Sequence, residues 1–149
     1  MAAERTPDPS GPPSTYHIDS VSIRLALHPG RGGKSVQSLS LSGNGEATVK
    51  RDGKLLQFPY PRDDFLNLLN EFYRIRFFDL PKTYAIRYSM FLKEDGMVAM
   101  SALKMPDVPS TQVCVVIEEY EKCVMFGRDG PSELKSIAQK LLEVIESER

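Results

Sequence analysis

The feature that most constrains the fold is a series of short segments with alternating apolar residues, separated by glycine-centred turns. Leu39 and Leu41 precede the turn Gly43-Asn44-Gly45, and Ala47 and Val49 follow it. A three-residue loop with Gly45 at positive φ sets Leu41 opposite Ala47 and Leu39 opposite Val49, so all four side chains share one face. The pattern therefore predicts a half-buried antiparallel hairpin.

The same pattern extends to both sides of this hairpin. Residues 18–27 alternate as a strand, and Asp52-Gly53 predicts a tight two-residue turn that pairs Val49 with Leu56. Apolar residues at helical spacing predict amphipathic helices at 62–74 and from Pro131 onward. Further strands are predicted at about 84–93, 97–103, 112–117 and 122–126.

The predicted order is four strands and a helix, twice over, which is either a coincidence of layout or an old duplication. We expect an α+β fold in which a largely antiparallel sheet of about eight strands carries two amphipathic helices on one face. Residues 1–15 hold four prolines and no large aliphatic side chain, so they predict a disordered arm. Residues 16–149 then form a single domain.

Charge and hydropathy exclude several classes of protein. The net charge is −1, with 19 basic and 20 acidic residues interspersed, so nucleic-acid binding is not expected. No apolar stretch is long enough for a transmembrane helix, and no targeting segment is visible. The compartment stays open between the cytoplasm and a processed envelope protein.

Residues 28–35 form a glycine-rich loop that ends in Gly-Lys-Ser, like a phosphate-binding loop. Such a loop must open a helix, whereas residues 36–41 alternate like a strand, so nucleotide binding is rejected. A weak anion site formed by His28, Arg31 and Lys34 stays as the alternative, in a small enzyme or ligand-binding protein. The chain has two histidines without metal-ligand spacing, so neither a metal nor a cofactor is predicted.

Cys114 and Cys123 flank the sequence Glu118-Glu119-Tyr120-Glu121. A turn centred on Glu118-Glu119 would set the cysteines opposite each other, as a cross-strand disulfide or a redox pair. Two glutamates are poor turn residues, so a longer loop with a shifted register is an equal alternative. Buried free thiols are the favoured state.

One predicted hairpin is apolar on both faces. A two-residue turn at Asp95-Gly96 pairs Phe91 with Met100. Either both faces are covered as internal core, which the pattern favours, or Phe91, Met97, Val98 and Met100 form an exposed patch. The exposed alternative predicts a non-enzymatic binding domain whose partner is another protein of unknown identity.

The segment from Phe72 to Tyr84 and the helix entry from Gly130 to Leu134 resemble a small uncharacterised bacterial domain family. The resemblance extends over about half of the chain. It implies a bacterial source, often an envelope setting, and no known activity, and it assigns no functional residue.

Overall fold

The computed structural model describes residues 11–29, 37–84, 86–104, 110–127 and 129–147. These residues form eight strands: β1 (Val21–His28), β2 (Gln37–Ser42), β3 (Glu46–Arg51), β4 (Lys54–Pro59), β5 (Ile86–Leu92), β6 (Val98–Lys104), β7 (Ser110–Ile117) and β8 (Tyr120–Phe126). The helices are α1 (Arg62–Arg74) and α2 (Ser132–Ser147), with short 3-10 turns at Ile18–Ser20 and Phe77–Asp79. The predicted α+β fold with antiparallel strands is confirmed.

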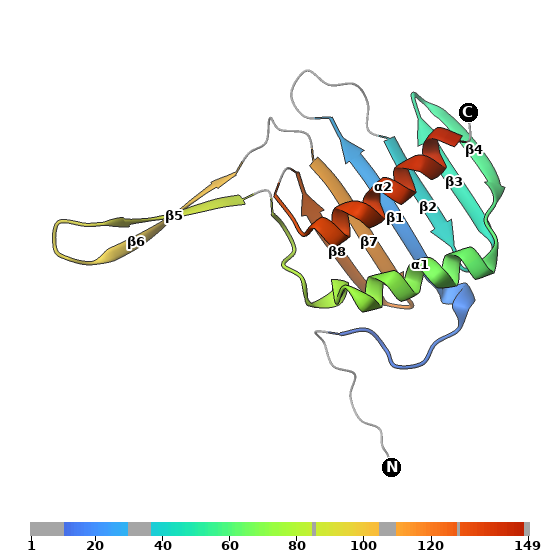
Figure 1. Cartoon of the computed structure of the whole chain (residues 1–149), viewed down its shortest axis with the longest axis horizontal. Helices are drawn as coiled ribbons and strands as arrows, with labels where there is room; N and C mark the ends of the chain where they lie inside the picture. The colour runs from blue at the N-terminus through green and yellow to red at the C-terminus, as the bar shows by residue number, and fades with distance from the viewer. Residues whose placement is uncertain (1–10, 30–36, 85, 105–109, 128, 148–149) are drawn as a thin grey trace, which may run out of the picture.

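The eight strands divide into two sheets (Figure 1). A six-stranded sheet has the order β4-β3-β2-β1-β7-β8, and β5 pairs with β6 in a separate two-stranded sheet. The two halves of the chain therefore have different structures: the first contributes four strands to the large sheet and the second contributes two. The first strand starts at Val21 rather than Ile18, because residues 18–20 form a 3-10 turn.

The predicted pairing of β2, β3 and β4 is confirmed. Leu41 lies opposite Ala47, and Val49 lies opposite both Leu39 and Leu56. Gly45 has a φ of 102°, as the three-residue loop requires. These turns hold the apolar side chains of the three strands on one face of the sheet.

Both helices lie on this apolar face (Figure 1). Phe65 and Phe72 of α1 are fully buried, as are Leu134 and Leu141 of α2. Leu56 was expected in the core, but its side chain is 40% exposed because β4 is the edge strand of the sheet.

The opposite face of the six-stranded sheet is mostly polar, with a few apolar side chains such as Leu55 and Val116. It alternates with the buried side chains and carries Ser22, Arg24, Ser40, Thr48 and Lys50, all of them half-buried or exposed. No helix of the described residues packs against this face (Figure 1).

The predicted register of the β5–β6 hairpin is wrong by one residue. Phe91 lies opposite Ala99, not Met100, because the loop has three residues, Glu94 to Gly96, instead of two. Gly96 has a φ of 85° and donates its N–H to the carbonyl of Lys93 (3.0 Å), which closes the longer loop.

Candidate functional site: a projecting apolar hairpin

The β5–β6 hairpin projects away from the body of the molecule (Figure 1). Its exposed apolar side chains are between 51% and 73% accessible: Met90, Phe91, Leu92, Met97, Val98 and Met100. None of them belongs to the buried core of the described residues. The favoured prediction, that this hairpin is internal core, is therefore wrong.

The hairpin projects because the β8 edge of the large sheet is already occupied by the residues that precede it. Strand β7 pairs with β1 and β8, and residues 82–84 then run beside β8. Tyr84 donates its N–H to the carbonyl of Met125 (2.7 Å), and the N–H of Met125 donates to the carbonyl of Lys82 (2.9 Å). These residues occupy the β8 edge of the sheet, so the hairpin that follows them forms its own two-stranded sheet.

The observed register gives the hairpin one continuous apolar face. Met90 lies opposite Met100 and Leu92 opposite Val98, and alternation along each strand puts these four side chains on the same side. Phe91 lies on the other side, opposite Ala99. The predicted contact residues are thus exposed but divided between two faces, and Met90 and Leu92 were missed because the predicted loop was one residue too short.

The tip of the hairpin is charged. Lys93, Glu94 and Asp95 are all exposed, and the carboxylate of Asp95 accepts the N–H of Met97 (3.0 Å). The arm therefore combines an apolar middle with a polar end, the distribution found across protein interfaces.

The two cysteines form a disulfide, so the prediction of free thiols is wrong. The turn is the two-residue one, with Ile117 opposite Tyr120, because Glu118 adopts the left-handed conformation at φ 56°. The carboxylate of Glu121 lies 3.6 Å from the sulfur of Cys123. These three side chains would be close enough to share a metal ion, but the two sulfurs are bonded to each other.

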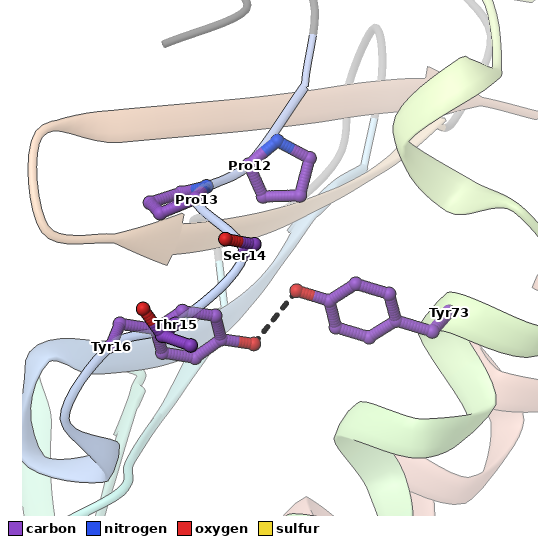
Figure 2. Close-up of a pocket in the computed structure, with 6 residues that line it drawn as sticks. All are labelled: Pro12, Pro13, Ser14, Thr15, Tyr16 and Tyr73. Atoms are coloured by element: carbon purple, nitrogen blue, oxygen red, sulfur yellow. Dashed lines mark hydrogen bonds between the residues drawn. The ribbon is translucent and has the colours of Figure 1, made fainter. Parts of the chain in front are cut away.

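A cavity of about 520 Å³ lies between the segment Pro12 to Tyr16 and Tyr73 of α1 (Figure 2). The two tyrosine hydroxyls are 2.7 Å apart and share a hydrogen bond. Burial and the bond to Tyr16 raise the pKa of Tyr73, so its hydroxyl stays neutral and keeps its hydrogen bond to Tyr16. Tyr16, directly after the predicted arm, thus contacts α1, while residues 1–10 lie outside the described structure and the disordered arm stays a prediction.

A smaller cavity, about 150 Å³, lies between α1 and α2. Lys140 donates to both carboxylate oxygens of Glu71 at 2.8 Å, so the two charges neutralise each other. Burial and the nearby carboxylates of Asp64 and Glu71 raise the pKa of Tyr60. This cavity offers little attraction to a charged ligand.

The predicted anion site is described only at His28. This residue ends β1 and is half-buried, and its Nε2 atom has no hydrogen-bond partner among the described residues. Arg31 and Lys34 lie outside the described residues, so the anion site stays a prediction.

Comparisons with protein families, with curated proteins and with solved structures each found no match to this chain. The resemblance to an uncharacterised bacterial family therefore stays a prediction. Among the helices of the described residues, none is long and apolar enough to cross a membrane.

Proposed function

We propose that this chain is a non-enzymatic protein-binding domain and that the β5–β6 hairpin is the element that contacts the partner. The observation that carries the proposal is the exposure of six large apolar side chains, 51% to 73% each, on an arm outside the core. Contiguous exposed apolar surface of this kind marks interaction sites in proteins.

The secondary structure of the arm supports the same function. A two-stranded hairpin is only marginally stable in water by itself, and packing against another surface stabilises it. Met90, Met97 and Met100 supply flexible, polarisable side chains that adapt to the shape of a partner. A partner that covers the face of Met90 and Leu92 would therefore stabilise the hairpin as it binds.

The charges at the tip favour a protein surface over a lipid bilayer. Insertion of the arm into a membrane would carry Lys93, Glu94 and Asp95 into the hydrocarbon, where each charge costs several kcal/mol. Against a protein, the same residues can stay at the solvated rim of the interface while the apolar middle is buried.

Site-specific photocrosslinking tests the proposal. Phe91 is replaced by p-benzoylphenylalanine in the full chain, which is irradiated in extracts of the cells that express it. The same substitution at Leu66, an exposed apolar position of α1, is the matched control. We expect a crosslinked protein from position 91 that is absent from position 66, and its purified form should bind the unmodified chain.

Three outcomes would contradict the proposal. The first is the absence of any crosslink specific to position 91, and the second is equal crosslinking from both positions. The third is flotation of the chain with phosphatidylcholine and phosphatidylglycerol vesicles that depends on the hairpin, which would identify a membrane as the partner.

A further inference from the structure

We infer a second functional site, independent of the hairpin: the Cys114–Cys123 disulfide exchanges with small thiols, which attack Cys123 and release Cys114 as a thiolate beside Arg24. The inference depends on the position of the bond in the sheet and on the charges at its two ends.

The disulfide lies on the polar face of the six-stranded sheet. Val113 and Val115 point into the core, so Cys114 between them points to the face that no helix of the described residues covers. Cys123 lies directly opposite on β8, the last strand of this sheet. The bond is therefore at the margin of an open face and outside the hydrophobic core.

The two sulfurs have different electrostatic surroundings. Arg24 on β1 lies directly opposite Cys114 and projects from the same face, so its charge favours a thiolate at Cys114. The carboxylate of Glu121, 3.6 Å from the sulfur of Cys123, disfavours a thiolate there. Negative charge released on cleavage of the bond is consequently more stable on Cys114.

Access to the two sulfurs also favours attack on Cys123. An attacking thiolate approaches a sulfur along the line of the bond, from the side opposite the leaving sulfur. For Cys123, which is half-buried, this approach comes from beyond β8, over the segment that lies beside this strand. For Cys114, which is 7% exposed, it would come from over β1, where Arg24 projects. The segment beside β8 contacts this strand on both sides of Cys123: the carbonyl of Leu80 accepts a hydrogen bond from the Nζ of Lys122, and Thr83 pairs with Met125.

The reaction is a two-electron exchange. A thiolate attacks Cys123, forms a mixed disulfide with it and displaces Cys114 as the thiolate. A second thiolate then attacks the outer sulfur of the mixed disulfide, which releases the oxidised small-molecule disulfide and leaves Cys123 reduced. Two thiols are oxidised for each protein disulfide that is reduced, and solvent supplies protons to whichever cysteines become neutral.

Mixed-disulfide trapping in the folded, full-length protein tests the inference. The protein is treated with 2-mercaptoethanol, quenched with iodoacetamide, and mapped by peptide mass spectrometry. We expect the small thiol on Cys123 and the alkyl group on Cys114. Arg24→Gln should slow the reaction about threefold. Loss of the cation raises the pKa of the leaving Cys114 thiol, and a rise of about one unit lowers the rate by about half a power of ten.

Matched variants separate the effect of the Arg24 charge on the reaction rate from a general change in the structure of the sheet. Lys50→Gln removes a cation of the same face from β3, two strands from Arg24, and should react at the rate of the unmodified protein. Arg24→Lys keeps the positive charge and should also react at that rate. Glu121→Gln should increase the share of adduct on Cys114. The inference is overturned if the bond opens only as the protein unfolds, if the thiol is found mainly on Cys114 in the unmodified protein, or if Arg24→Gln and Lys50→Gln react equally fast.

Discussion

Replacing Met90 and Met100 together by serine should weaken binding to the hairpin's partner and leave the folded body unchanged. The two side chains lie opposite each other across β5 and β6 and form the middle of the apolar face. Each is more than 60% exposed in the free chain, so each has most of its apolar surface available for a partner.

The magnitude follows from that exposure. Full burial of a methionine side chain is worth about 1.5–3 kcal/mol, and somewhat more than half of each side chain remains to be buried on binding. The pair should therefore contribute about 2–4 kcal/mol, which corresponds to a loss of affinity on the order of 30- to 700-fold. Because the same surface is already in water in the free chain, the free energy of unfolding should change by less than about 1 kcal/mol.

Calorimetric titration with the partner identified by crosslinking measures the affinity, and urea unfolding measures the free energy of unfolding. Leu66→Ser is the matched control for affinity, since it removes an exposed apolar side chain outside the hairpin and should leave the affinity unchanged. About half of this side chain is buried, so the free energy of unfolding should fall by about 1 kcal/mol. Phe91→Ser tests which face is used, because this ring projects to the other side of the hairpin. The reasoning is refuted if the double variant binds as tightly as the unmodified chain, or if it unfolds the body.

Three further predictions concern the body. Gly43→Ala should lower the free energy of unfolding, measured in urea, by roughly 1–3 kcal/mol, because the new methyl group would meet the backbone of the first 3-10 turn. Gly53→Ala has open space but a positive φ and should lower it by about 1–2 kcal/mol. An unchanged stability of Gly43→Ala would contradict the steric argument. Burial and a hydrogen bond raise the pKa of Tyr73, so its contribution to stability is complete below its unfolded pKa of about 10 and is lost as the pH rises further; Tyr73→Phe should flatten this alkaline loss, and an unchanged pH dependence would refute the assignment. Replacing Cys114 and Cys123 by alanine should lower stability by roughly 2.5 kcal/mol for a sequence separation of 9, whereas no measurable loss would show that the bond does not constrain the unfolded chain.

The turns at Gly43-Asn44-Gly45 and Asp52-Gly53 show what can be predicted from the sequence. Leu39, Leu41 and Val49 are flanked by polar residues, so a slip of one residue would expose every one of them. Only the register with Gly45 in the left-handed region keeps them together, and this is the register of the structure.

The β5–β6 hairpin shows where the same reasoning fails. Its strands carry large apolar residues at successive positions, as in Met90, Phe91 and Leu92, so either register leaves apolar side chains on both faces. The pattern therefore could not choose between a two-residue and a three-residue loop. A strand that is apolar on both faces also has the same pattern whether it is covered by two layers or extends into solvent.

The disulfide was missed as the favoured state because Glu118 takes a backbone conformation that glutamate seldom adopts. With Glu118 at φ 56°, the short turn forms and the cysteines come into register. Residue preferences at a single turn are weaker than the pairing of β7 with β8, because Val113 and Val124 are both buried and the two-residue turn sets them opposite each other on the core face.

Strands β7 and β8 carry the disulfide and also lie at the base of the hairpin. The hairpin leaves the body just after residues 82–84 pair with β8, and the chain next enters the body at Ser110, where β7 begins. The Cys114–Cys123 bond joins β7 to β8 and so fastens together the two strands that flank the base of the hairpin. The apolar residues of the hairpin can therefore change without disturbing the core, whereas a change that separates β7 from β8 would disturb the exchange site and the anchorage of the hairpin together.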